Sequence, residues 1–243
     1  GISGSEWNRD KDGNVILDVN TGMPTSSGLT TLQIGNREPT LSGGFNNSLQ
    51  YKNWNLSFLL DFRLGGDIYN GTDYWMTSQG MSLRSQDRES LTINGVVDSG
   101  TKDANGAVIY SPKTFTYEAG KIYDIKSGTK IIQQSGEYLI RNYWTSSYAN
   151  ESANYMTNTN ILRLRSISLS YNLPENLIKR QHIIKGASAT LTGTNLFLLT
   201  NYKGMDPETS AAGSGVTGSS SVGMDYCGVP ATAGFSVGIN LTF

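Results

Sequence analysis

Hydrophobic and polar residues alternate with a period of two in several long segments of the chain. At the C-terminus, Phe, Val, Ile, Leu and Phe occupy every second position of residues 235–243, with small or polar residues between them. Residues 54–64 repeat this pattern, and only Leu59 breaks it. Because successive side chains of a strand point to opposite faces of a sheet, each segment predicts a β-strand with one apolar face.

Three further segments are predicted to be strands. Only two residues, Lys52 and Asn53, separate residues 42–51 from the strand at 54–64, so the two segments are predicted to form a hairpin with a very short turn. Residues 187–199 alternate alanines with hydroxylated residues and end in an apolar run. Residues 160–172 alternate cleanly only in their second half. The chain thus predicts an all-β fold with about five long strands.

The predicted strand at 160–172 changes phase near its middle. Leu162 and Leu164 have the opposite parity to Ile167. Either a β-bulge lies between them, or Arg163 and Arg165 face outward and their long side chains reach lipid head groups. We prefer the second interpretation at this stage.

The connections between the predicted strands alternate in length. Short connections at 52–53 and 173–186 separate long ones at about 65–159 and 200–232. Outer-membrane barrels alternate in this way between short periplasmic turns and long extracellular loops. The predicted division is therefore an extracellular loop segment at 1–41, followed by barrel strands and their extracellular loops over 42–243.

A soluble β-sandwich would show the same alternation, because its apolar faces meet in a shared core. Two features favour a membrane instead. The predicted strands reach the roughly 9 to 11 residues that a tilted strand needs to cross a bilayer, and aromatic residues lie near their ends, as in interfacial girdles. Five strands cannot close a barrel, and open edges in lipid are costly, so we expect other strands to complete the sheet.

Charge and composition exclude several classes of function. The 19 Lys and Arg residues balance 20 Asp and Glu residues and are scattered, so nucleic acid is not an expected partner. Cys227 and His182 are the only residues of their kinds, which excludes an intrachain disulfide and a multi-Cys or multi-His metal cage. Phosphate-loop, dinucleotide-binding, nucleophile-elbow and zinc signatures are missing, so we predict no enzyme.

The first residues show neither a basic nor an apolar region typical of a signal peptide. The longest unbroken apolar run, Leu196 to Leu199, is far shorter than the roughly 20 residues of a spanning helix. For an exported protein, we therefore expect that the true N-terminus lies elsewhere or has been removed.

Four motifs resemble, in order and spacing, the last strands of SusC-like (RagA-type) TonB-dependent outer-membrane transporters. They are IGNREPTLSGGFNNSLQYKNWNLSFLLDFRLGGDIYN (34–70), ILRLRSISLSYNLP (161–174), LTGTNLFLLTNYKGMDPE (191–208) and GFSVGINLTF (234–243). The resemblance implies the C-terminal strands of a large antiparallel transmembrane β-barrel with long extracellular loops. It also implies that Phe243 is similar to the terminal aromatic read by the outer-membrane assembly machinery.

The resemblance further implies import of oligosaccharides or peptides across the outer membrane of a Gram-negative bacterium. The partners it implies are the remainder of the barrel and its plug, a SusD-like surface lipoprotein, membrane lipid, and TonB through an N-terminal region outside this sequence. Two alternatives remain open: a secreted or surface glycan-binding β-sandwich module, and a small pore assembled from several copies.

One acidic segment is a weak candidate for a calcium site. Asn8, Asp10 and Asp12 precede Gly13 with the spacing of half of a calcium loop. The acidic residue that such a loop requires at its twelfth position is replaced by Val19. We therefore favour an Asp-Gly turn, and expect no cofactor.

The long predicted loop at 65–159 carries aromatic residues that are candidates for contact with substrate or with a protein lid. The alternative is that they pack the loop against itself. The candidates are Tyr74, Trp75, Tyr143, Trp144 and Tyr148.

Charged residues close to the strands are expected on the lumen side. Asp61 and Arg63 share the polar face of their strand and are expected to pair with each other or with neighbouring strands. Asp206 and Glu208 flank Pro207, a spacing that invites an acid/base interpretation. The resemblance marks that motif as structural, so no catalytic residue is predicted.

Overall fold

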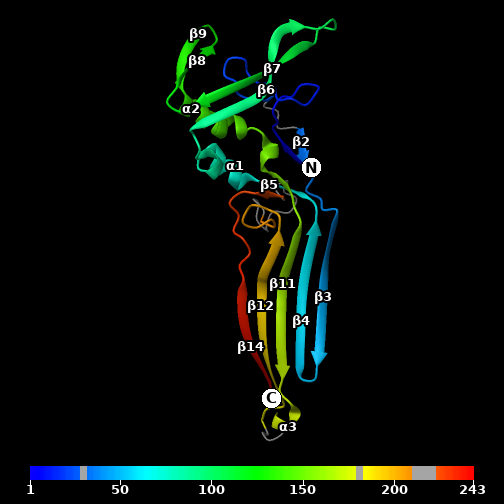
Figure 1. The fold of residues 1–243 in the computed structure, drawn as a ribbon. Helices are drawn as coiled ribbons and strands as arrows, with labels where there is room; N and C mark the ends of the chain where they lie inside the picture. The colour runs from blue at the N-terminus through cyan, green and yellow to red at the C-terminus, as the bar shows by residue number, and fades with distance from the viewer. Residues whose placement is uncertain (28–31, 179–182, 210–222) are drawn as a thin grey trace. The chain divides into compact units, whose positions relative to one another are not determined.

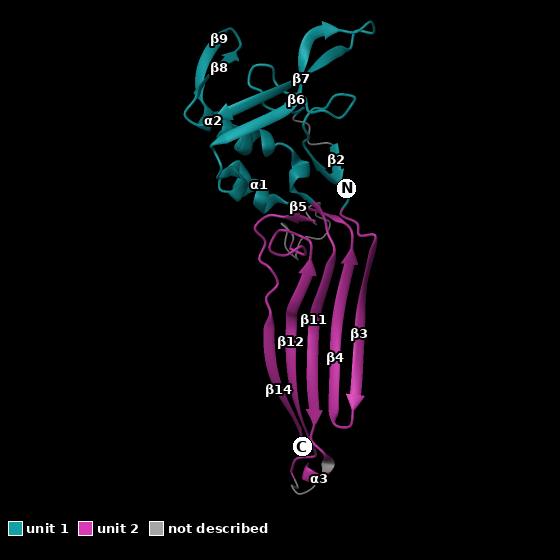
Figure 2. Ribbon diagram, in the orientation of Figure 1, with its two compact units in different colours: residues 1–36, 69–156 teal, residues 37–68, 157–243 magenta. Residues whose placement is uncertain are grey.

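The computed structural model describes residues 1–27, 32–178, 183–209 and 223–243. Within these residues the chain divides into two compact units (Figure 2). Unit 1 consists of residues 1–36 and 69–156, and unit 2 of residues 37–68 and 157–243.

Unit 2 is built on one five-stranded sheet (Figure 1). Its strands follow the order β14-β12-β11-β4-β3, and all neighbours are antiparallel. All five predicted strands are confirmed, each to within one residue at either end. They are β3 (Leu41–Tyr51), β4 (Trp54–Leu64), β11 (Ile161–Asn172), β12 (Gly186–Thr200) and β14 (Gly234–Thr242).

The hairpin of β3 and β4 shows how a short turn fixes the register. Tyr51 pairs with Trp54, so the turn contains only Lys52 and Asn53. Lys52 has a φ of 53°, a positive value of the kind that two-residue hairpin turns require. This register places Leu49 opposite Leu56, and the apolar faces of the two strands coincide.

Most apolar residues of the five strands lie on the same face of the sheet, and Leu59, Ile161 and Leu198 lie on the other. One row crosses it completely, because each of its members pairs directly with the next. In strand order from β3 to β14, the row is Leu49, Leu56, Leu169, Leu191 and Val237. A one-residue slip of any strand would move its apolar residues to the other face.

The phase change in β11 is a β-bulge. Its pairing shifts between Leu164 and Ser166 on both sides, toward β4 and toward β12. Leu164 pairs with Leu60, and Ile167 pairs with Phe58. Since these β4 partners are two residues apart, Leu164 and Ile167 share the apolar face although three positions separate them. The bulge therefore keeps apolar residues of both halves of β11 on one face of the sheet.

The preferred sequence interpretation of this strand was wrong. Arg163 does not reach outward toward lipid head groups: it is 2% exposed, and its guanidinium contacts Asp206 on the polar face. Arg165 also forms its ion pairs with carboxylates there. Sequence parity failed because a bulge inserts one residue, which inverts the parity of everything beyond it.

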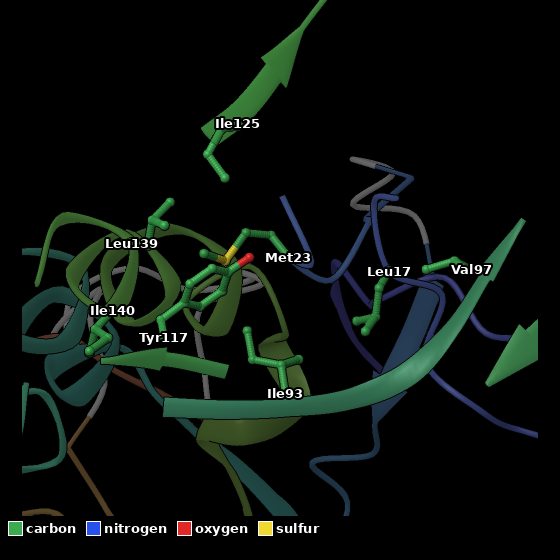
Figure 3. Packing of buried hydrophobic residues seen from close by; sticks show 8 residues of the cluster. All are labelled: Leu17, Met23, Ile93, Val97, Tyr117, Ile125, Leu139 and Ile140. Atoms are coloured by element: carbon green, nitrogen blue, oxygen red, sulfur yellow. The ribbon is translucent and has the colours of Figure 1, made fainter. Parts of the chain in front are cut away.

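The apolar face of the sheet is open in the described part of unit 2. Phe45 on β3 and Phe235 on β14 are 53% and 75% exposed. The buried hydrophobic cluster, shown in Figure 3, lies entirely in unit 1. Its members are Leu17, Met23, Ile93, Val97, Tyr117, Ile125, Leu139 and Ile140. In the described residues, the long strands do not form the dry, two-layer core of a sandwich.

Unit 1 contains most of the segment expected to be a long loop, and it has secondary structure of its own. Two hairpins and two α-helices dominate it, and the residue Asn70 caps the first helix by accepting a hydrogen bond from the Asp73 amide. The hairpins are β6 (Ser90–Lys102) with β7 (Val108–Glu118), and β8 (Ile122–Ser127) with β9 (Lys130–Ser135). The helices are α1 (Gly71–Ser78) and α2 (Gly136–Asn142).

Shorter elements complete the two units. In unit 1, β1 (Ile2–Gly4) pairs with β2 (Leu32–Gly35), and single helical turns occur at Leu83–Ser85, Tyr143–Tyr148 and Ser152–Tyr155. The remaining elements are β5 (Asp67–Asn70), β10 (Met156–Asn158), α3 (Glu175–Ile178) and β13 (Met224–Asp225). Among the described residues, no helix is both long and apolar enough to span a membrane.

The assignment of the two faces can be tested with adjacent residues of β4. Phe58 lies on the apolar face and Ser57 on the polar face. Near the bilayer midplane, Phe58→Arg should destabilise the complete barrel by roughly 2 to 4 kcal/mol, because the charge would enter hydrocarbon, whereas Ser57→Arg should be mild. Urea unfolding in lipid vesicles would measure both, and equal costs would contradict this assignment.

The core of unit 1 gives a second prediction. Ile140 is fully buried in the hydrophobic cluster, and Ile131 on β9 is largely exposed. Ile140→Ala should lower the local stability of unit 1 by about 2 to 5 kcal/mol through lost packing, while Ile131→Ala should change it little. Hydrogen exchange of the α2 amides would report the difference. Equal protection in the two variants would show that the cluster does not hold the unit together.

Candidate functional site

The polar face of the sheet presents a surface of small hydroxyl and amide groups. One row of hydroxyl side chains crosses all five strands, next to the leucine row but on the opposite face. It consists of Ser48, Ser57, Ser168, Thr192 and Ser236. The side-chain oxygens of Ser168 and Thr192 lie 2.8 Å apart, within hydrogen-bonding distance. Such a surface is wettable and electrically neutral.

Charged residues of the five strands gather toward one end of this face. The strands contain only four, namely Asp61, Arg63, Arg163 and Arg165. Asp61 lies opposite Arg163 in the pairing of β4 with β11. The remaining length of the polar face therefore has no charged side chain.

Two carboxylates after β12 join these residues in a charged cluster, defined here as Asp61, Arg163, Arg165, Asp206 and Glu208. Glu208 bridges the two arginines: its Oε2 lies 2.6 Å from Nε of Arg163, and its Oε1 lies 2.5 Å from Nη2 of Arg165. Arg163 Nη2 also lies 2.5 Å from Asp206 Oδ1, and Arg165 Nε lies 2.6 Å from Asp61 Oδ2. Every member is thus paired with an opposite charge.

Asp206 is the most enclosed carboxylate of the charged cluster. Asp206 and Arg163 are 3% and 2% exposed. Burial by itself would raise the pKa of Asp206, but the backbone amides of Glu208 and Ala231 donate hydrogen bonds to it and Arg163 adds a positive charge, so the pKa is held below its usual range. Asp206 therefore remains ionised and anchored at neutral pH.

The residues predicted on the lumen side are placed on the polar face, although Asp61 and Arg63 do not pair with each other. Asp61 binds Arg165 of the neighbouring strand. Arg63 instead donates hydrogen bonds to the backbone carbonyls of Arg37, at 2.6 Å, and Gly65, at 3.3 Å. Arg63 thereby joins the segment before β3 to the segment after β4.

The five candidate aromatic residues belong to one aromatic cluster in unit 1. Ring centroids are 5.1 Å apart for Tyr143 and Trp144, 5.0 Å for Trp144 and Tyr148, and 5.7 Å for Tyr74 and Trp75. The buried ring of Tyr155 links them, because it packs on both Tyr74 and Tyr148.

The members of the aromatic cluster differ in exposure. Tyr143 and Trp144 pack against the hydrophobic cluster of unit 1, and burial raises the pKa of Tyr143. Trp75 is 52% exposed. Of the five predicted contact residues, Trp75 alone presents a large exposed ring, while Tyr143 and Trp144 carry a packing role.

Arg84 was not singled out from the sequence, and it organises the polar side of the aromatic cluster. Its Nη1 donates a hydrogen bond to the Tyr148 hydroxyl at 2.9 Å, and its Nη2 forms an ion pair with Asp73. The guanidinium also lies 5.3 Å from the centre of the Tyr148 ring. Only a tertiary structure could reveal this contact, because 64 positions separate the two residues.

The calcium candidates form a hydrogen-bonded turn. Asp10 accepts hydrogen bonds from the Asn14 side chain and from the amides of Asn14 and Asp12, and these bonds lower its pKa. Asn8 donates to the Thr25 hydroxyl. Within the ranges that the structure describes, no group of three or more acidic, His or Cys residues could hold a metal ion.

Phe243 follows β14 directly and is 67% exposed. It has the same parity as Leu241, which lies on the apolar face opposite Ala187. A role as an assembly signal stays a prediction.

Comparison with known proteins agrees with this geometry. No family model matches the chain. TonB-dependent receptor P26 of Formosa agariphila is 25% identical over 244 residues, which covers 100% of this chain and 20% of the relative. TonB-dependent receptor P3 of the same organism is 24% identical over 211 residues, which covers 86% of this chain and 17% of the relative. The chain thus spans about a fifth of the length of these relatives.

Two solved structures share the fold. They are structures of the RagAB peptide importer in its "closed-closed" and "open-open" states, each with a TM-score of 0.54 and a match covering 99% of this chain and 22% of that chain. The sequence identities are 19% and 20%. The sequence resemblance is thereby confirmed: the chain is homologous to TonB-dependent receptors, and its fold is that of antiparallel strands from the β-barrel of such a transporter.

Proposed function

We propose that this chain supplies part of the wall of a TonB-dependent transporter in the outer membrane of a Gram-negative bacterium. The observation that carries the proposal is the separation of the leucine row on one face of the sheet from the hydroxyl row on the other. An open apolar face is stable against hydrocarbon, and a hydroxyl face is stable against a wet lumen. The named relatives are receptors and an importer, which supports the same role.

The proposal requires further strands beside β3 and β14. These two strands form the edges of the sheet, and in the described residues nothing pairs with their outer sides. In lipid, each unpaired backbone amide or carbonyl costs several kcal/mol. The rest of the barrel, with its plug, is therefore the first partner that we propose.

The proposed cargo is an oligosaccharide or a peptide, taken up together with a SusD-like surface lipoprotein and with energy delivered through TonB. The proposal includes neither an enzymatic step nor a cofactor. Asp206 and Glu208, the carboxylates with the spacing of an acid/base pair, are bound by Arg163 and Arg165 instead of facing a substrate.

Dependence on a membrane tests the proposal against the alternative of a soluble glycan-binding module. The full-length protein should fractionate with outer membranes and should aggregate when detergent is removed, because the leucine face would then meet water. A monodisperse protein in plain buffer would contradict the proposal. As a control, detergent exchange with lipid nanodiscs should keep the protein dispersed.

Trp75 is the residue that we propose for contact with cargo or with the lipoprotein lid. Its exposed ring stands beside Met76, which is also exposed. Trp75→Ala should weaken binding of cargo or lipoprotein by more than about 1 kcal/mol, a loss that only a minority of interface residues cause, without altering stability. Calorimetry of the purified receptor would measure the loss of affinity.

Trp144→Ala provides the matched comparison. Because Trp144 packs against the hydrophobic cluster, this variant should lower the stability of unit 1 more than it weakens binding. Unchanged binding in a stable Trp75→Ala variant would leave only a packing role for the aromatic cluster.

A further inference from the structure

The segment that follows β12 lies against the polar face of the sheet. Two legs of the connection from β12 to β14 are described, residues 201–209 and residues 223–233. Asp206 and Glu208 in the first leg form ion pairs with Arg163 and Arg165 of β11. These ion pairs define on which side of the sheet the connection folds.

The arginines point to the face that bears the hydroxyl row. Arg165 binds Asp61, and Asp61 lies four residues along β4 from Ser57, a spacing that keeps two strand residues on one face. The first leg therefore folds inward over the hydroxyl face. It does not extend straight away from the end of the sheet.

The two legs are also bound to each other. The Tyr202 hydroxyl lies 2.8 Å from Oδ2 of Asp225, and both residues are buried. The amide of Ala231 donates a hydrogen bond to Oδ2 of Asp206 at 3.0 Å. Asp206 thus connects the wall of the sheet, its own leg and the returning leg.

Burial distinguishes this arrangement from ordinary ion pairs on the surface of a loop. Exposed pairs contribute little, because water and salt screen them. The Arg163–Asp206 pair is almost completely buried, and removal of one partner would leave an uncompensated charge that is strongly destabilising. The Arg163–Asp206 pair thus holds the first leg to β11.

We propose that residues 201–209, pinned to the barrel wall by the charged cluster, and residues 223–233, bound to residues 201–209, form an inward-folded constriction of the transport path. The inference rests on the proposed function, because a lumen exists only when further strands close the sheet. The charged groups of the cluster are paired with one another. Cargo that passes the constriction therefore meets a neutral wall of hydroxyl groups beyond it.

Spin-label distances in the full-length receptor test this proposal. One label replaces Met205, which is exposed in the first leg, and the other replaces Asn240, which is exposed on the polar face of β14. Cys227 is first changed to Ser so that only these two positions react. The parent should give a single narrow distance distribution, at the separation that the structure predicts.

Removal of the pinning charges should release the first leg, whereas β13 (Met224–Asp225) keeps the second leg in a three-stranded sheet. Asp206→Asn with Glu208→Gln should replace the narrow peak by a broad distribution at longer distances. Glu208→Gln alone should broaden it partly, and it serves if the double variant does not fold. Glu118→Gln is the matched control, because it removes an exposed ion pair with Lys121 in unit 1 and should leave the peak unchanged.

Two outcomes would overturn the proposal: a broad distribution in the parent, or an unchanged narrow peak in folded variants that lack the pinning charges. Folding is checked by the shift of the heat-treated band on an electrophoresis gel. Failure of the proposed function would be seen separately, as a receptor that does not fractionate with membranes at all.

Discussion

The structure depends on the register of one antiparallel sheet. Five strands align so that a row of aliphatic side chains and a row of hydroxyls run across opposite faces without interruption. Because side chains alternate along a strand, a slip of one residue would put hydroxyls into hydrocarbon and leucines into water. The turn at Lys52 and the bulge at Arg165 are the two local devices that keep this register.

Much of the fold was predictable because the pattern that specifies it is local. Period-two alternation located all five strands of the sheet in unit 2, since each of these strands presents one apolar and one polar face. The bulge in β11 was not predictable from the alternation alone. A strand with one inserted residue and a strand whose arginines face outward have the same pattern of apolar and polar residues. Burial of Arg163 against Asp206 decided between them.

The site residues were predictable only in part. The sequence placed Asp61 on the polar face but could not identify Arg165 as its partner, since 104 positions separate them. From the sequence alone, all five aromatic candidates were assigned the same candidate role, contact with substrate or with a lid. In the structure Trp75 is exposed, whereas Trp144 packs against the hydrophobic cluster. Most of the segment expected to be a loop folds within unit 1. Its longest strand, β6, was missed because its alternation stops after Leu91 and Ile93, where Gly95, Val96 and Val97 follow.

The central claim is that one face of the sheet meets hydrocarbon while the other meets water. The most direct measurement is the accessibility of a spin label, placed in turn at each residue of 234–242 of the full-length protein in lipid bilayers, to oxygen and to a water-soluble nickel complex. The account predicts a strict alternation, with oxygen contact greatest at Phe235, Val237, Ile239 and Leu241 and nickel contact greatest between them. Equal access of both reagents at neighbouring positions would contradict it.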